Sequence, residues 1–344
     1  MRHRARRSFM VVIVALAACR PDERVAPRLP SVDAPLSAVY PAAAYAISTL
    51  PDYGWFSDVN EKNVMAGTIT GVAGNALNAF SYQPGGLVKL LAMPGGMTSA
   101  ANAVNNHGAV VGTVSYGNFD NRPAVWSDPS ALPLVAGIQG VAYDINGAGL
   151  VVGTAIVNGG QFGFVWDTTS KPVKLPPLPG GLNTTASAVN ADRIILGTSS
   201  SRAGWTSVLW RFNGSVWVPT AITGGINALA LDNATTVVGQ TAGEASWGKP
   251  NHAGFLGVGV WSYATAVTSN GRVAVGNSFY PVLGPTGANN AFVADRSGAV
   301  TMLPIPSSWW TAATGRGVNS CGLAVGSLTF NSMGAHPASW NPGC

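Results

Sequence analysis

The feature that most constrains the fold is a sevenfold internal repeat. A glycine that follows small aliphatic residues recurs along the chain at intervals of 37 to 50 residues, and a turn-forming residue lies seven positions before it. The seven pairs are Asn60 and Gly67, Asn105 and Gly112, Asn146 and Gly153, Asn190 and Gly197, Asp232 and Gly239, Ser269 and Gly276, and Asn319 and Gly326. A constant spacing within units and a variable spacing between them indicates rigid units joined by loops of different length.

Each unit has the pattern of four short antiparallel strands. In the second unit, 100–104 leads into the turn 105–108, where Asn and Gly suit a tight hairpin, and 109–114 returns. A third strand ends on an aromatic residue such as Trp126 or Trp166, and a fourth follows in several units. No segment shows sustained 3.6-residue periodicity, so few helices are expected. Seven such units predict an all-β fold, a seven-bladed β-propeller.

The two ends of the repeat array predict how the ring closes. The last unit stops after Trp340 without a fourth strand, and an unassigned segment, 45–51, precedes the first unit. The apolar positions and proline of this segment match 88–94 and 300–306, register for register. We therefore expect the N-terminal strand to complete the last blade and remove its exposed edges.

These units resemble a known family of repeats. The segments that carry the resemblance are Asn146–Gly153, His336–Trp340, Asn78–Phe80 and Asn290–Phe292. They are similar to the bacterial extracellular HAF repeat, which is named for a His-Ala-Phe signature that this chain keeps loosely. The resemblance covers nearly all of 43–344 and implies export and a propeller-like fold. It implies no reaction.

The N-terminus has the pattern of an export signal. Residues 1–18 combine a basic start with an apolar run too short to span a bilayer. They lead into Leu16-Ala17-Ala18-Cys19, which resembles a bacterial lipobox, so Cys19 is the expected lipidation site. An ordinary signal peptide and a twin-arginine signal at Arg6-Arg7 stay open as alternatives. The proline-rich segment 19–42 predicts an extended tether, and 43–344 the propeller.

The charge of the chain lies largely in this signal. Removing its four arginines lowers the formal net charge from +5 to +1. No basic patch remains in the rest of the sequence, so nucleic acid is excluded as an expected partner. We expect a monomer at the bacterial cell envelope, in the outer membrane or at the cell surface, that touches the membrane only through its lipid.

The sequence offers little catalytic chemistry. After the signal only three histidines remain, and no zinc-protease, nucleophile-elbow, phosphate-loop or EF-hand motif occurs. We expect no catalytic residue, metal or cofactor. Asp58 and Asp144 lie beside turns, where a local hydrogen-bond acceptor is the usual role, but a glycosidase-like pair assembled from different blades stays open. Cys321 and Cys344 form an even pair in an exported chain, which predicts a disulfide.

Antiparallel strand order assigns the loops to two faces. The turns between strands one and two and between strands three and four share one face, which we call the turn face. The other connections form the variable-loop face, where 241–251 and 277–289 are the longest loops. Aromatic residues that the repeat does not require are expected in these loops. They are Tyr53, Trp55, Trp205, Trp247, Trp309 and Trp310.

These aromatic residues are the candidate ligand-binding residues, and packing of loops onto the blades is their structural alternative. The leading hypothesis is a non-enzymatic, envelope-anchored propeller that binds a glycan or a protein through the variable-loop face. The alternative is a propeller-type enzyme, a hydrolase or lyase that acts on polysaccharide.

Overall fold

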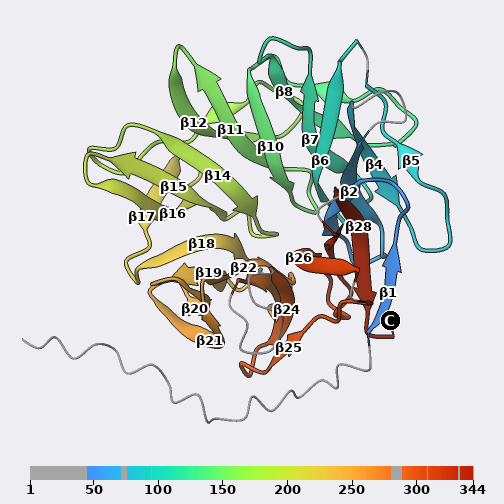
Figure 1. Cartoon of the computed structure of the whole chain (residues 1–344). Helices are drawn as coiled ribbons and strands as arrows, with labels where there is room; N and C mark the ends of the chain where they lie inside the picture. The colour runs from blue at the N-terminus through green and yellow to red at the C-terminus, as the bar shows by residue number, and fades with distance from the viewer. Residues whose placement is uncertain are drawn as a thin grey trace, which may run out of the picture. The chain divides into compact units, whose positions relative to one another are not determined.

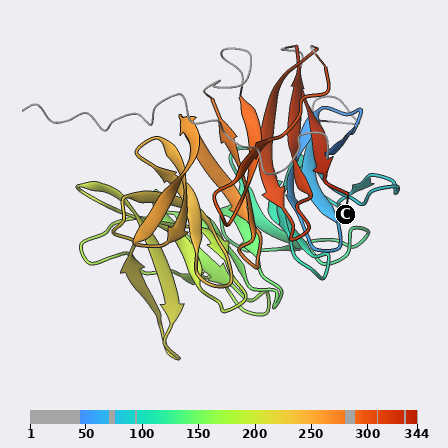
Figure 2. The same ribbon diagram turned by 90° about the horizontal axis from the view of Figure 1, so that it is seen from below.

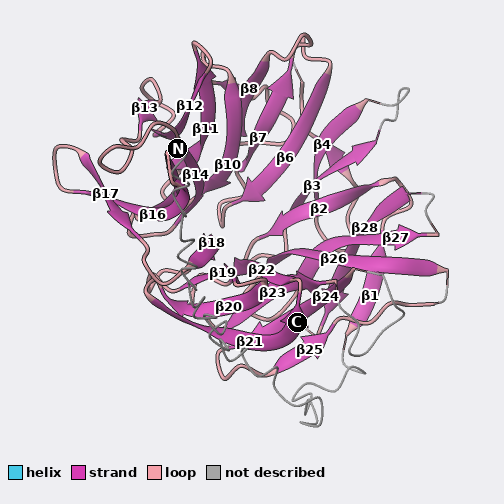
Figure 3. Ribbon diagram, turned by 60° about the vertical axis from the view of Figure 1, so that its left-hand side comes forward, coloured by secondary structure: helices cyan, strands magenta, loops and turns pink. Residues whose placement is uncertain are grey.

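The computed structural model describes residues 45–344, except 71–75, 94, 280–288, 308, 332–333 and 344. The secondary structure of this described part consists of strands, turns and loops, without a helix (Figure 3). It therefore contains no helix of the length and hydropathy needed to cross a bilayer. Cys19, the tether and the signal lie outside the described residues.

The strands form seven four-stranded antiparallel sheets that follow one another around a central axis (Figure 1). Blade 1 contains β2 (Gly54–Val59), β3 (Met65–Thr70), β4 (Leu77–Tyr82) and β5 (Lys89–Leu90), and blade 2 contains β6 (Thr98–Val104), β7 (Val110–Ser115), β8 (Asn121–Trp126) and β9 (Leu134–Val135). Blade 3 contains β10 (Gly140–Ile145), β11 (Val151–Val157), β12 (Gly160–Trp166) and β13 (Val173–Lys174), and blade 4 contains β14 (Thr184–Val189), β15 (Ile195–Ser201), β16 (Gly204–Phe212) and β17 (Trp217–Ala221).

The remaining blades have the same strand order. Blade 5 contains β18 (Ile226–Leu231), β19 (Val237–Thr241), β20 (Glu244–Lys249) and β21 (His252–Val260), and blade 6 contains β22 (Ser262–Val267), β23 (Val273–Ser278), β24 (Asn290–Asp295) and β25 (Val300–Met302). Blade 7 contains β26 (Trp310–Val318), β27 (Ala324–Phe330), β28 (Gly334–Asn341) and β1 (Ala46–Thr49). The predicted seven-bladed β-propeller is confirmed.

The ring closes through β1, as the sequence predicts. This strand pairs antiparallel with β28, from Ala46 opposite Asn341 to Thr49 opposite Ala338. The amide of Leu50 then donates to the carbonyl oxygen of Pro337 at 3.0 Å. Figures 1 and 2 both show the blue β1 beside the red strands of blade 7. The first and last parts of the propeller therefore share one sheet.

The repeated glycine is required by a close approach of two strands. A Cβ added at Gly112 would lie 1.9 Å from the carbonyl oxygen of Ala100, and one at Gly326 would lie 1.8 Å from that of Thr314. A Cβ added at any of the other five repeat glycines would lie 1.9 to 2.3 Å from a carbonyl oxygen of the first strand. No side chain fits in that space, because real Cβ atoms do not come this near a backbone oxygen.

The aromatic residue that ends the third strand belongs to the core between blades. Trp126, Trp210 and Trp340 are fully buried. Their indole N–H groups donate to backbone carbonyl oxygens 34 to 36 residues earlier, at 2.7 to 2.9 Å. Each tryptophan thus buries a large apolar surface and satisfies its one polar group, as buried indoles normally do.

The turn-forming asparagines join the blades in a ladder of hydrogen bonds on the turn face. The Oδ1 atom of Asn105 accepts from the amides of His107 and Ala109, and its Nδ2 donates to the carbonyl oxygen of Asn146 at 3.1 Å. Equivalent Nδ2 bonds to the next blade are made by Asn60, Asn146, Asn190 and Asn319. These buried amides define the spacing between neighbouring turns.

Blade 6 departs from the predicted spacing. The constant spacing of the repeats predicts Ser269 at the turn position. Thr268 occupies this position instead, because this turn contains one additional residue. The amide of Thr268 bonds the carbonyl oxygen of Val273, five residues on, whereas that of Asp232 bonds Thr236, four residues on. The prediction for Ser269 is therefore wrong by one residue.

Candidate functional site

Three of the predicted aromatic residues meet where blade 7 adjoins blade 1 on the variable-loop face. Trp309 is 62% exposed and stacks on Phe330 with ring centroids 6.5 Å apart. Trp310 meets the edges of Phe330 and His336, and Tyr53 lies 4.8 Å from the His336 ring. The expected meeting of these residues on neighbouring blades is thus observed. We call these five residues the seam cluster.

The seam cluster is partly a packing feature. Trp310 begins β26 and is half-buried against the core of blade 7. The His336 Nδ1 atom lies 3.3 Å from the carbonyl oxygen of Leu50, which ties this histidine to the chain between β1 and β2. Trp309 and Tyr53, which is 47% exposed, present their rings to solvent.

The structure corrects the placement of two other predicted aromatic residues. Trp55 was expected in a loop but is the second residue of β2, where the Arg316 guanidinium lies 5.4 Å above its ring. Trp247 was expected in a long loop, 241–251, but most of that segment forms β20. Trp247 pairs with Val238 and packs half-buried against the core of blade 5. The expected pair of Trp205 and Trp247 on one face is therefore wrong.

The reason for the error at Trp247 is a shift of one residue. In blades 2, 3, 4 and 7 the tryptophan lies two residues after the partner of the repeat glycine. In blade 5 that partner is Ser246, so Gly248 occupies the tryptophan position. The second long loop, 277–289, begins within β23, and its residues 280–288 lie outside the described part of the chain.

Trp205 does lie on the variable-loop face, beside a groove between blades 4 and 5. Its side chain is 55% exposed, and it pairs with Ser200 where β15 turns into β16. The groove encloses about 670 Å³. Its lining residues are Gln161, Thr185, Thr198, Trp205, Thr206, Ser207, Ile222, Thr223, Gly225, Ile226 and Asn227. One exposed indole thus adjoins a wall rich in neutral hydroxyl and amide groups, with no charged side chain.

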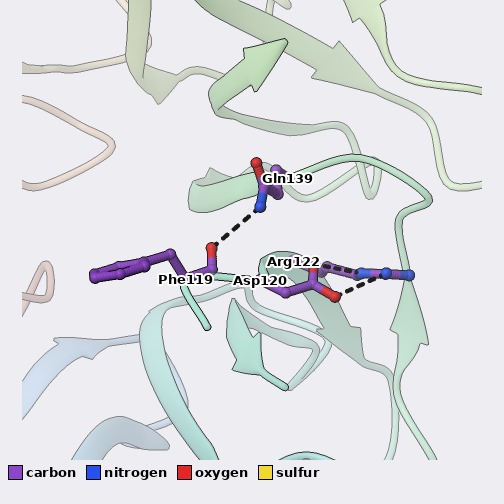
Figure 4. A network of polar contacts seen from close by, with 4 residues as sticks. All are labelled: Phe119, Asp120, Arg122 and Gln139. Atoms are coloured by element: carbon purple, nitrogen blue, oxygen red, sulfur yellow. Dashed lines mark hydrogen bonds and ion pairs between the residues drawn. The ribbon is translucent and has the colours of Figure 1, made fainter. Parts of the chain in front are cut away.

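The loop between β7 and β8 on the same face is held by an ion pair. Arg122 and Asp120 share two hydrogen bonds of 2.9 and 2.8 Å, and this interaction lowers the pKa of Asp120 (Figure 4). Gln139 of the next connection donates to the carbonyl oxygen of Phe119 at 3.3 Å. Figure 4 shows the Phe119 ring directed away from the pair, and it is 92% exposed.

A groove of about 730 Å³ lies between blades 3 and 4 toward their outer strands. Its wall includes the exposed side chains of Val173, Val216, Val218 and Phe212. Asp167 at its rim accepts a 2.7 Å hydrogen bond from Ser170. Apolar groups dominate this groove, so it offers little to orient a polar ligand.

A cavity of about 370 Å³ opens at the centre of the turn face. Its shape comes from a β-bulge in the first strand of every blade, where the register against the second strand shifts by one residue. The bulged residues are Ser57, Asn102, Tyr143, Ser187, Leu229, Thr265 and Arg316, and all seven line the cavity. Bulges redirect single side chains in this way and are common beside functional sites.

The two carboxylates considered for catalysis follow bulged residues in this cavity. Oδ2 of Asp58 accepts from the amide of Val104 in blade 2 at 3.0 Å, and Oδ2 of Asp144 accepts from that of Val189 in blade 4 at 2.7 Å. Burial raises the pKa of Asp58 to about 7 and that of Asp144 to about 6. They line the same cavity, on the face opposite the Trp205 groove, and each carboxylate joins two blades.

The Arg316 guanidinium and the Tyr143 hydroxyl also line the cavity. Desolvation lowers the pKa of the Arg316 guanidinium and raises that of the Tyr143 hydroxyl. Within the described residues, no group of three or more His, Cys, Asp or Glu side chains is arranged to hold a metal ion. The bulged residues were not singled out from the sequence, although several are variable positions between small residues, as in Ala101-Asn102-Ala103.

The predicted disulfide and lipid sites are placed only in part. Cys321 is exposed in the turn between β26 and β27. A Cβ added at the adjacent Gly322 would lie 3.4 Å from Pro342, so the C-terminal segment passes this turn. Cys344 and Cys19 lie outside the described residues, and the disulfide and the lipidation therefore stay predictions.

Solved structures with the same architecture share little sequence with this chain. A catalytically inactive virginiamycin B lyase from Staphylococcus aureus, solved with quinupristin, is 9% identical, with a TM-score of 0.54 over 86% of this chain and 99% of that one. The β-propeller domain of the Trilobed protease from Pyrococcus furiosus is 10% identical, with a TM-score of 0.51 over 84% of this chain and 95% of that one.

A prolyl endopeptidase is 14% identical, with a TM-score of 0.53 over 86% of this chain, and the match spans 48% of that enzyme. No family model matches the chain, and no curated protein matches it. At these identities the likeness shows the propeller fold alone.

Proposed function

We propose that this protein is a lipid-anchored binding protein of the bacterial cell envelope, a monomer in the outer membrane or at the cell surface, that binds a neutral glycan. The observation that carries the proposal is the exposed Trp205 indole beside an uncharged groove of about 670 Å³. A flat aromatic ring offers an apolar surface for the C–H face of a sugar ring. Hydroxyl and amide side chains can exchange hydrogen bonds with its hydroxyl groups.

The contrast with a catalytic site supports binding over the alternative of a polysaccharide hydrolase or lyase. Glycoside hydrolysis generally needs two carboxyl groups on either side of the scissile bond. No described carboxylate lines the Trp205 groove. Asp58 and Asp144 line a cavity on the other face, where their oxygens accept backbone amides of neighbouring blades.

The lipobox-like Cys19, the proline-rich tether and the resemblance to the HAF repeat support the proposed location. A tether of this composition is extended and would hold the propeller away from the membrane. The membrane is then touched by the lipid alone, and the variable-loop face is available for a polymer of the envelope.

A glycan array with the full-length protein, followed by calorimetry on the best neutral oligosaccharide, tests this proposal. We expect Trp205→Ala to weaken binding by about 1 to 3 kcal/mol, the range for an aromatic anchor. The melting temperature should hold, because the ring is more than half exposed. Phe119→Ala, on the same face but outside the groove, is the matched control and should bind as the parent does.

Trp309→Ala separates the two candidate surfaces of the variable-loop face. Unchanged glycan binding in this variant, together with its loss in Trp205→Ala, supports the groove. Loss only in Trp309→Ala would transfer the site to the seam cluster. A full array without any hit, combined with capture of a protein partner that depends on Trp309, would replace the glycan by a protein ligand.

A further inference from the structure

The central cavity of the turn face has the features of a second, separate site. A ring of equal blades would place seven equivalent side chains around its axis, yet the seven bulged residues differ in size, charge and polarity. The volume of about 370 Å³ is within the range of small-molecule sites, roughly 300 to 1,000 Å³. The backbone is repeated here, whereas the chemistry is particular to each blade.

Arg316 brings to this cavity a positive charge that forms an ion pair with no described carboxylate. It is the one lysine or arginine among the lining residues. Within the described part of the chain it forms no ion pair and no side-chain hydrogen bond, whereas Arg122 is fully engaged by Asp120. Its guanidinium carbon lies 5.4 Å from the centroid of the Trp55 ring, a cation–π contact. A cation–π contact does not engage the N–H donors in hydrogen bonds, so they can serve an anion.

Several other polar side chains of the cavity already donate to backbone carbonyl oxygens. Ser57 Oγ donates to the carbonyl oxygen of Ala101 at 2.7 Å, and Asn102 Nδ2 donates to that of Ala142 at 2.8 Å. Thr265 Oγ lies 3.1 Å from the carbonyl oxygens of Val275 and Gly315. These side chains retain acceptor lone pairs, and a ligand that complements them must bring hydroxyl donors of its own.

We infer that the central cavity binds a small organic acid that also carries several hydroxyl groups, of the uronic-acid type, with its carboxylate held by Arg316. Arginine presents paired N–H groups that match the two oxygens of a carboxylate. Asp58 is only partly ionised at neutral pH because burial raises its pKa to about 7, and the two oxygens of Asp144 already accept from the amides of Ile145 and Val189. Glu61 at the mouth is already engaged by the amide and the hydroxyl of Ser320.

Calorimetry of the full-length protein with D-glucuronate, D-glucose and acetate tests the inference. D-Glucose keeps the hydroxyl groups and has a hydroxymethyl group in place of the carboxylate, whereas acetate keeps the carboxylate alone. We expect D-glucuronate to bind at least about tenfold more tightly than either, since only it satisfies both the cation and the acceptors. The absence of D-glucuronate binding, or equal affinities for D-glucuronate and acetate, would overturn the inference.

Variants locate the site independently of overall folding. Arg316→Gln should weaken D-glucuronate binding about tenfold or more, because it removes a charge-assisted pair. Ser187→Trp should also abolish binding, since it fills the cavity from blade 4 while Arg316 remains. Arg211→Gln, on the exposed part of β16, and Trp205→Ala, in the glycan groove, should leave D-glucuronate binding unchanged. Unaltered binding in Arg316→Gln at an unchanged melting temperature would refute the assignment.

Discussion

Blades 2 and 7 hold their outermost strands in different ways. In blade 2, β9 makes only two residue pairs with β8, but a short covalent turn connects the two strands. In blade 7, β1 comes from the other end of the propeller and makes four residue pairs with β28, extended by the Leu50 amide. A longer hydrogen-bonded ladder thus replaces a covalent connection. The two ends of the propeller are therefore joined in one sheet by the β1–β28 ladder, in addition to the packing of blade 7 against blade 1.

The largest expected effect comes from removing β1. Deleting residues 43–51 takes away β1 and leaves the β28 edge and part of the blade 7 core open. We expect loss of the cooperative urea transition or of solubility. Substituting Leu134 and Val135 of β9 by glycine is the control. It should keep a cooperative transition, because that strand is short, partly exposed and tethered. A deleted chain that unfolds like the parent would show that β1 does not close the ring.

The predicted disulfide would reinforce the same blade from its other end. Cys321 lies in the β26–β27 turn, and Cys344 follows β28 by three residues, so the bridge would close a loop of 24 residues. Such a loop contributes about 3 kcal/mol in the chain-entropy model, reduced by any strain. Non-reducing peptide mass spectrometry of periplasmically expressed protein should find the linked peptides. Two free thiols would refute the bridge.

A smaller effect on stability is expected from Asp58, which joins blades 1 and 2. Its pKa of about 7 exceeds the ordinary 3.8, so between these values the folded state binds more protons than the unfolded state. The free energy of unfolding should therefore fall as pH rises from about 4 through 7.

Asp58→Asn tests this pH dependence. The amide oxygen can still accept from Val104, and it carries no charge at any pH, so the difference in stability between pH 5 and pH 8 should shrink. Asp120→Asn changes an exposed carboxylate and is the control. Urea titrations at both pH values measure the difference, and an unchanged pH profile in Asp58→Asn would assign it to other groups.

The parts that the sequence predicts are those governed by local periodicity. The distance from Asn105 to Gly112 within one hairpin specifies a turn and a close approach, and the orphan segment 45–51 carries the pattern of an outer strand. Local patterns were misleading where a blade deviates by one residue. Thr268 replaces the expected Ser269, because its turn is longer. Trp247 lies in β20, one residue before the position that tryptophan occupies in other blades.

The central cavity could not be predicted from local sequence patterns, for a different reason. Each bulged residue, such as Asn102 or Arg316, looks like one polar residue in a strand. Only the closed ring brings these residues, about 40 positions apart in sequence, around one axis. The sequence predicted the tryptophan of the Trp205 groove. It did not predict the hydroxyl-rich wall, because the residues of that wall come from three different blades.

The asparagine ladder has a consequence for how such a ring can change over generations. Each rung runs from a side-chain amide to a peptide carbonyl, and every residue type supplies a peptide carbonyl. A blade copied by gene duplication therefore brings the side-chain amide donor, and any neighbouring blade supplies the backbone carbonyl acceptor. The residues that join the blades are thus different from the residues that line the cavity. A substitution at one bulge can therefore alter the cavity without changing how the blades join.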